Sequence, residues 1–253
     1  MTDKDTSWGT SAKWYSDYLE TTEDSYQKQV ILPGLLRVLN LQKGEKLLDV
    51  ACGQGFFARE FAKAGAAVVG ADISPELIEE AKKLSPIGIT YHVATADSLS
   101  FAEPESFDAV TIVLAIQNIE DMSAAFGEAA RVLKKGGRLV LVIMHPAFRI
   151  PTATHWGYDE ERRVQFRRVD SYLSMSRSEL LVHPGEKESP VTISYHRSLQ
   201  DFSKALFKHG FAITKLEEWI SHKQSQNGPR RVAEDKSRKE FPLFMMIEGR
   251  KLG

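Results

Sequence analysis

The segment from Leu47 to Ala58 constrains the fold more than any other part of this sequence. Its first residues are apolar except for one acid, Asp49, and are typical of a short buried strand. Gly53 and Gly55 follow, and they favour a tight turn whose backbone can approach a ligand closely. From Phe56 the apolar residues recur at helical spacing. The segment therefore predicts a strand, a glycine loop and a helix, which together form a ligand site at a helix N-terminus.

Strand-like and helix-like patterns alternate strictly from residue 46 to residue 144. The apolar runs are short and nearly continuous, as expected for strands that are buried on both faces. This alternation predicts an α/β fold with a parallel, doubly wound sheet. The expected strands are residues 46–51, 67–71, 89–94, 107–114, 138–144, 211–216 and 241–247.

Helix boundaries are indicated by capping residues. Ser74, Ser123 and Ser198 are each predicted to cap a helix N-terminus, and Ser198 has the spacing of a capping box with Asp201. Two helices are expected before the first strand, over residues 13–20 and 24–39, the second with a kink or break at Pro33 and Gly34. Residues 221–240 hold more basic than acidic side chains around a Gly-Pro pair and are predicted to form a surface loop.

Composition excludes several classes of protein. With 33 Lys and Arg against 34 Asp and Glu, the chain lacks the basic excess of a dedicated nucleic-acid binder. Its longest apolar runs are far too short to span a bilayer, and the N-terminus lacks the apolar core of a signal peptide. The one cysteine, Cys52, fits a reducing compartment, so a cytoplasmic location is expected.

The charge of Asp49 discriminates between two kinds of cofactor. Gly53, Gly55 and Ala58 formally match the dinucleotide fingerprint, yet a carboxylate at Asp49 would repel the pyrophosphate of NAD. The acid suits a ligand that brings positive charge to the same place, such as an amino group close to a sulfonium. S-adenosylmethionine is such a ligand.

The run from Leu48 to Gly55 also resembles motif I of the class I S-adenosylmethionine-dependent methyltransferases. Residues 131–137 resemble a second pattern of that family, with Lys135 in place of a proline. The resemblance implies a seven-stranded Rossmann-like sheet whose last strand is antiparallel, and S-adenosylhomocysteine as the product. It implies cofactor contacts at Asp49, Ala51, Cys52, Gly53, Gly55, Asp72, Ile73, Asp97, Ser98 and Leu114.

Two of these positions have alternative interpretations. Asp72 ends the second strand, where a carboxylate can receive ribose hydroxyls, but it could instead cap the helix that follows. We expect the ribose role. Cys52 could be a reactive thiol, and we expect instead a small residue packed beneath the cofactor.

The chain divides by pattern into four parts. These are an N-terminal helical lid at 1–40, a cofactor-binding core at 41–146, a substrate cap inserted at 147–197, and the C-terminal part of the core at 198–253. In the family resembled, N-terminal helices lie over the cofactor and help to form the substrate site. This implies substrate contacts at Trp14, Tyr15 and Tyr18, with Trp156 from the cap, although the first three could simply pack on the core. His145, at the end of the fifth strand, is the candidate general base, and His196 is a second.

These observations predict methyl transfer to an O, N or C nucleophile of a small molecule. An RNA or protein methyltransferase is the alternative, supported by the basic segment at 221–240, and an NAD(P)-dependent oxidoreductase is a remoter one. No spacing of metal ligands is found, so no metal is expected. Neither a membrane nor a nucleic acid is expected as a partner, and the sequence does not indicate an oligomeric state.

Overall fold

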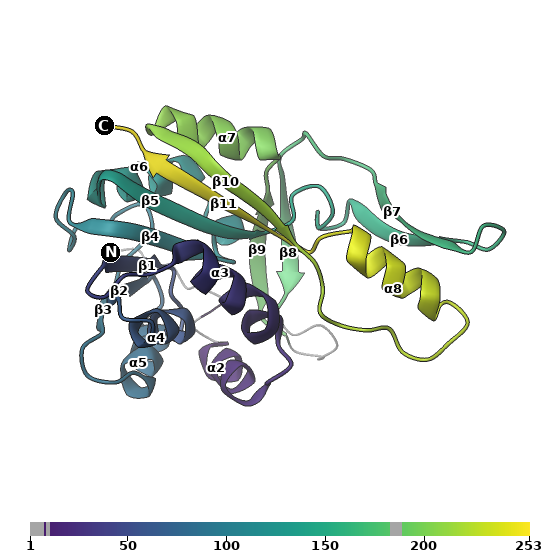
Figure 1. Ribbon diagram of the computed structural model, residues 1–253, viewed down its shortest axis with the longest axis horizontal. Helices are drawn as coiled ribbons and strands as arrows, with labels where there is room; N and C mark the ends of the chain where they lie inside the picture. Colours follow the sequence, from purple (N-terminus) through teal and green to yellow (C-terminus); the bar gives the residue numbers. More distant parts are fainter. Residues whose placement is uncertain (1–7, 9–10, 183–188) are drawn as a thin grey trace.

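A seven-stranded sheet forms the centre of the molecule in a computed structural model, which describes residue 8, residues 11–182 and residues 189–253 (Figure 1). Neighbouring strands follow the order β10-β11-β5-β4-β1-β2-β3. Only β11 runs against the others, since it pairs antiparallel with both β5 and β10. The predicted doubly wound sheet with an antiparallel last strand is confirmed. Its strands are β1 (Lys46–Val50), β2 (Ala67–Asp72), β3 (Thr90–Val93), β4 (Phe107–Val113), β5 (Leu133–Met144), β10 (Phe211–Trp219) and β11 (Phe244–Lys251).

Helices cover both faces of this sheet. On one face lie α6 (Met122–Val132) and α7 (Leu199–Lys208), and on the other lie α3 (Leu32–Leu39), α4 (Phe56–Lys63) and α5 (Pro75–Leu84) (Figure 1). Alternate residues of one strand enter opposite cores: Leu141 packs with the first group and Val142 with the second. Because both faces of the sheet are covered, side chains on both sides of a strand are buried, and the strands are therefore nearly continuously apolar.

The chain before β1 forms α2 (Ala12–Thr21), a short π-helical segment, η1 (Gln27–Ile31), and α3. Pro33 lies in the first turn of α3, directly after the π-helical segment, so the predicted kink or break coincides with the change from π-helical to α-helical winding. Leu35 is fully buried and joins the core. Of the predicted lid at 1–40, α3 therefore belongs to the core layer, while residues 1–7 and 9–10 lie outside the described residues.

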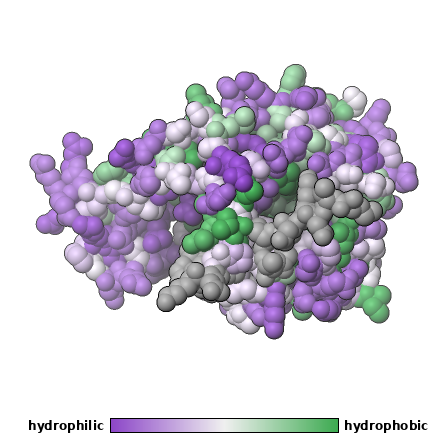
Figure 2. All heavy atoms as spheres, turned by 180° about the vertical axis from the view of Figure 1, so that it is seen from behind, coloured by the Kyte–Doolittle hydropathy of each residue, from purple (hydrophilic) through white to green (hydrophobic). Residues whose placement is uncertain are grey.

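The predicted cap consists of two β-hairpins. One pairs β8 (Ser176–Leu181) with β9 (Val191–His196), and the other pairs β6 (Thr154–Asp159) with β7 (Val164–Val169). The β6–β7 hairpin projects sideways from the sheet together with α8 (Arg231–Glu240), and we call β6, β7 and α8 the arm (Figure 1). The surface of the arm is predominantly hydrophilic (Figure 2).

Two local predictions are wrong. Residues 231–240 of the predicted surface loop form α8, which packs on β7, where Ser237 donates a hydrogen bond to the carbonyl of Gln165. The N-cap of α6 is Asp121, whose side chain accepts the Ala124 N–H at 2.8 Å, and not Ser123. The hydroxyl of Ser123 instead meets the His209 ring across to α7. The predicted caps at Ser74 and at Ser198 with Asp201 are confirmed.

Candidate functional site

The chain reverses its winding between β1 and β4, which are neighbours in the sheet. From β1 the strands proceed to β2 and β3 on one side, while β4 and β5 lie on the other. Ligands of open α/β sheets bind at the carboxyl ends of the strands beside such a switch point. Here Ala51 (φ 55°) and Leu114 (φ 52°) follow β1 and β4, and both adopt the left-handed conformation. Such strained backbone clusters at functional sites, and both residues were predicted to contact a cofactor.

The glycine loop after β1 depends on residues without side chains. Gly53 (φ 56°) and Gly55 (φ 79°) are both left-handed. A Cβ atom on Gly55 would lie 2.4 Å from the hydroxyl oxygen of Tyr91. Helix α4 begins directly after Gly55, and no side chain caps it. The loop is therefore held closely against the sheet, and N–H groups at the start of α4 are left for a ligand.

Asp49 is a buried carboxylate with one oxygen satisfied and one not. The Thr111 hydroxyl, directly opposite on β4, donates to Oδ1 at 2.7 Å. Among the described residues, Oδ2 has no hydrogen-bond partner, although Asp49 is only 1 % exposed. Burial raises the pKa of Asp49 to about 7, against the Thr111 hydrogen bond that lowers it. An unsatisfied buried acceptor of this kind is unusual, and a donor or cation of a ligand would satisfy it.

Asp72 holds the loop and the next helix in place. Its two oxygens accept the N–H groups of Gly53 and Ser74, each at 2.9 Å. Burial raises the pKa of Asp72, and these hydrogen bonds oppose the rise. The role at the helix start is therefore present, and each carboxylate oxygen has a further lone pair for a ligand hydroxyl. Ile73, next in the chain, is half-buried.

Three further predicted cofactor residues differ in their exposure. Asp97 and Ser98 follow β3 and are both exposed. Cys52 is buried, and its Sγ approaches the carbonyl oxygen of Gly53 at 3.6 Å. Burial raises the pKa of the Cys52 thiol well above its ordinary value, so the group is an inert thiol. This favours the packing role over the reactive one.

Helix α2 is connected to the glycine loop by an ion pair. The buried guanidinium of Arg59 in α4 contacts the carboxylate of Glu20 in α2, and Arg59 also donates to the carbonyl of Gln54 at 2.8 Å. On α2, Trp14 and Tyr18 stack with ring centroids 5.6 Å apart, while the side chain of Tyr15 lies outside the described residues. The helix is thus positioned beside the loop, as a lid over a ligand would be.

The two candidate bases have different surroundings. Both ring nitrogens of His145 are engaged, since Nδ1 accepts the N–H groups of Ala147 and Phe148 and Nε2 donates to Glu218 at 2.7 Å. Burial lowers the pKa of His145, and Glu218 opposes that effect. His196 donates from Nε2 to the Tyr172 carbonyl at 2.7 Å, which leaves Nδ1 as an acceptor. The catalytic role of His145 stays a prediction, and its geometry is that of a residue fixing the turn after β5.

A cavity of about 470 Å³ adjoins the switch point, and His196 lines it together with Gln117. Gln117 donates to the carbonyl of Leu114, and its own buried Oε1 has no partner among the described residues. Trp156, predicted to contact the substrate, does not line the cavity. It packs in the arm, edge-on to Phe241 with ring centroids 5.5 Å apart. Thr111 was not predicted, because its role depends on Asp49, which lies on another strand.

A larger hollow of about 660 Å³ lies at the opposite edge of the sheet, where the strands begin. Several of its charged side chains are joined in ion pairs, such as Lys134 with Asp108 and Lys215 with Glu248. Within the described part of the chain, no three His, Cys, Asp or Glu side chains gather closely enough to hold a metal ion. None of the helices that the structure describes combines the length and apolar character needed to cross a membrane.

Known proteins match this chain in sequence and in structure. Residues 48–141 match the model of a methyltransferase domain. Demethylmenaquinone methyltransferase of Tropheryma whipplei (strain Twist) is 39% identical over 113 residues, which are 44% of this chain and 46% of that protein. Ubiquinone biosynthesis O-methyltransferase of Xanthomonas oryzae pv. oryzae (strain PXO99A) is 36% identical over 101 residues, which are 39% of this chain and 42% of that protein. The chain thus spans less than half the length of these curated relatives.

A structural neighbour covers more of the chain. The crystal structure of an S-adenosylmethionine-dependent methyltransferase from Mesorhizobium loti superposes with a TM-score of 0.68 and 28% identity. The superposition covers 87% of this chain and 96% of that one. It therefore extends well beyond the matched domain at 48–141.

Proposed function

We propose that this chain, which belongs to the class I S-adenosylmethionine-dependent methyltransferases, transfers a methyl group to an O, N or C nucleophile of a small molecule. The relatives named for demethylmenaquinone and ubiquinone biosynthesis support a small-molecule acceptor. The matched domain ends at residue 141, before the cap at 147–197. The matched domain therefore does not identify the methyl acceptor.

The observation that carries the proposal is the unpartnered Oδ2 of Asp49. It lies buried on β1, directly before a loop in which Gly55 is left-handed and has no room for a Cβ atom. An ammonium group would satisfy this oxygen and favour its ionised form, whereas a pyrophosphate would be repelled. When bound, S-adenosylmethionine supplies an amino group and a sulfonium-activated methyl group. The residues present fit that cofactor.

The other cofactor contacts follow from this placement. We assign the backbone of Ala51, Gly53 and Gly55 to the methionine part of the cofactor, with Cys52 packed beneath it. Asp72 and Ile73 would hold the ribose, because the free lone pairs of Asp72 suit two hydroxyl donors. Asp97 and Ser98, exposed at the end of β3, would hold the adenine. Leu114 would border the cofactor on the side of the acceptor cavity.

Positioning is the main task left to the protein, because the donor is already activated. The cavity is lined by Gln117, which donates to the carbonyl of Leu114, so an acceptor bound there would lie beside the turn after β4. Helix α2 would close over the glycine loop and exclude water. If the acceptor must lose a proton, His196 is better placed than His145 to take it. Its Nδ1 lone pair is not bonded to any described residue, and the residue lines the cavity.

The charges of residues 221–240 favour a small acceptor over RNA. Lys223 contacts Asp24, and Arg230 contacts Glu160. Arg231 lies 3.6 Å from Asp235. Three of the six Lys and Arg side chains in this segment are thus paired with acids, which weakens the case for a basic RNA-binding surface.

Calorimetry with S-adenosylhomocysteine and with NADH tests the proposal directly. We expect S-adenosylhomocysteine to bind and NADH not to bind, and the reverse result would exclude a methyltransferase. A metabolite extract incubated with enzyme and S-adenosylmethionine should then contain a small molecule heavier by one CH2, about 14 daltons by mass spectrometry. Methylation of added RNA or protein, with no small molecule modified, would support the alternative.

A further inference from the structure

The described residues that line the acceptor cavity include positively charged side chains and no Asp or Glu. It lies between the end of β5, the β8–β9 hairpin and the base of the arm. Part of its wall is apolar, at Ile143, Ile150 and Leu180. Two guanidinium groups, from Arg149 and Arg167, interrupt this wall.

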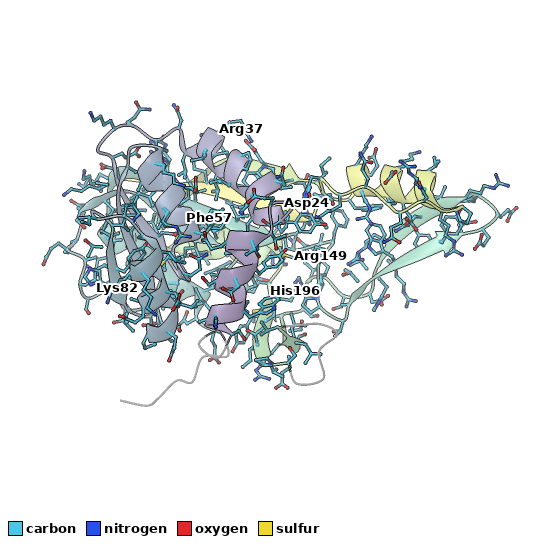
Figure 3. All side chains as sticks on the ribbon, turned by 90° about the horizontal axis from the view of Figure 1, so that it is seen from below. Asp24, Arg37, Phe57, Lys82, Arg149 and His196 are labelled. Carbon is cyan, nitrogen blue, oxygen red and sulfur yellow. The ribbon has the colours of Figure 1, made fainter. Side chains whose placement is uncertain are left out.

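The backbone N–H of Arg149 donates to the carbonyl of His145 at 2.9 Å, but its guanidinium has no hydrogen bond and no ion pair with any residue that the structure describes. It follows the turn after β5 and lies beside His196 in Figure 3, and both residues line the cavity. Several other arginines are paired with acids, such as Arg37 with Glu217 and Arg131 with Glu128. Arg149 is exposed, and no acid pairs with it among the described residues, so its guanidinium is accessible to a ligand in the cavity.

Arg167 is bonded only to neutral groups. It donates from Nε to the carbonyl of Phe148 at 2.9 Å and from Nη2 to the hydroxyl of Thr154 at 2.7 Å. Its guanidinium also lies 4.9 Å from the ring centroid of Trp156. Burial lowers the pKa of Arg167, and the like charge of Arg149 lowers it further. Arginine stays protonated at neutral pH, so the two neighbouring charges are held at an electrostatic cost.

A third arginine of the cavity has a separate role. Arg197 donates to the backbone carbonyls of Ile116, Ile119 and Glu120, and it lies 5.2 Å from the ring centroid of Tyr195. Its donors hold the turn after β4. The two guanidiniums of Arg149 and Arg167 remain as the charge that faces a ligand.

We propose that Arg149 and Arg167 form a subsite for an oxyanion group, carboxylate or phosphate, on the methyl acceptor. The inference rests on the proposed function, since it assumes that this cavity receives the acceptor. Guanidinium groups bind planar oxyanions through two parallel hydrogen bonds, which gives both affinity and orientation. The acceptor is then a small molecule with an apolar body, which packs on the cavity wall, and an anionic group, which fixes its direction. A cavity of about 470 Å³ has the size of a small-molecule site.

A purely structural role explains Arg167 but not Arg149. The hydrogen bonds of Arg167 join residue 148 to residue 154, so this side chain would stabilise the turn without any ligand. The side chain of Arg149 makes no hydrogen bond among the described residues, and Arg149 is exposed. Removing its charge should therefore not destabilise the free protein.

The test uses three probes of similar size: benzoate, phenyl phosphate and neutral benzyl alcohol. Each is titrated calorimetrically, at constant ionic strength and with saturating S-adenosylhomocysteine, into the native chain, Arg149→Gln and Arg230→Gln. Arg230 is the control, because it is an arginine of the arm that pairs with Glu160 outside the cavity. Melting temperatures of the three proteins are measured alongside.

We expect at least one of the anions to bind the native chain. Its affinity for Arg149→Gln should be about ten-fold or more lower than for the native chain, and its affinity for Arg230→Gln should be unchanged. Benzyl alcohol should bind more weakly than that anion and equally to all three proteins. The tighter of the two anions identifies carboxylate or phosphate as the recognised group. The melting temperature of Arg149→Gln should equal or exceed that of the native chain.

Three results would overturn the subsite. These are no binding of either anion at millimolar concentration, equal anion binding to Arg149→Gln and the native chain, or a lowered melting temperature of Arg149→Gln with unchanged anion affinity. Failure of the proposed function has a different signature, because S-adenosylhomocysteine would then not bind while the anions still bound through Arg149.

Discussion

A single carboxylate, Asp49, links the stability of the free protein to the binding of its cofactor. Its raised pKa means that the folded protein binds more protons than the unfolded chain between pH 3.8 and about pH 7. Stability therefore falls as the pH rises through this window, by up to about 1.4 kcal/mol for each pH unit. Asp49→Asn should remove this slope, and urea unfolding at pH 5, 6, 7 and 8 without cofactor would measure it. Parallel stability curves for the variant and the native chain would contradict the prediction.

The same substitution should weaken the cofactor complex. An amide cannot provide the negative charge that suits an ammonium, so we expect S-adenosylhomocysteine affinity to fall about ten-fold or more at pH 8. In the native chain the affinity should rise from pH 5.5 to pH 8, since binding favours the ionised form of Asp49, and in the variant it should not. Calorimetry across this range supplies both curves.

His145 and His196 should respond to substitution in opposite ways. His145→Ala leaves Glu218 and two backbone N–H groups without their partner, so we expect a loss of roughly 1–3 kcal/mol in the free energy of unfolding and little change in S-adenosylhomocysteine affinity. If the acceptor must lose a proton, His196→Ala should lower its turnover about 100-fold, because the variant lacks the general base. Urea unfolding and a turnover assay compare the two, and a turnover loss confined to His145→Ala would reverse the assignment.

At the scale of elements, α2 is connected to the glycine loop mainly through Glu20. Glu20→Gln leaves the buried guanidinium of Arg59 with a weaker, neutral partner. We expect a destabilisation of about 1 kcal/mol, because Glu20 is itself partly exposed, and faster hydrogen exchange of residues 12–21. Glu23→Gln is the control, since Glu23 contacts Lys28 as an exposed ion pair. Equal exchange rates in the two variants would show that α2 is held in place by other contacts.

The elements themselves were largely predictable, because their signals are local. Strands β1 to β5 follow from short apolar runs, and the caps at Ser74 and Ser198 follow from spacing within one turn. Helix α8 was missed because only Ser237 in it is buried, so it has no apolar face to give a helical pattern. Its position depends on β7, which lies far away in the sequence.

The site was predictable only where its residues lie together in the chain. Asp49, the glycine loop and Asp72 were found because strand ends place them at one edge. Thr111 becomes a partner of Asp49 only through the register of β4 against β1, and Arg149 faces Arg167 only because the arm folds back on the turn after β5. Tertiary packing, which no local pattern encodes, determines both contacts.

At the scale of the whole molecule, the fold separates a cofactor region from the projecting arm. The glycine loop, β1, β2 and α2 contact one another, while the arm of β6, β7 and α8 extends away from them (Figures 1 and 3). A ligand that binds only the folded state adds about 2.7 kcal/mol at 100 times its dissociation constant, and it protects the segments that it contacts against local opening. Saturating S-adenosylhomocysteine should therefore raise the melting temperature and slow hydrogen exchange in residues 12–21 and 49–58. Exchange in residues 154–169 and 231–240 should change little, because these segments open without breaking a cofactor contact. Equal protection of the arm and the glycine loop, measured by mass spectrometry, would show that the arm closes over the cofactor.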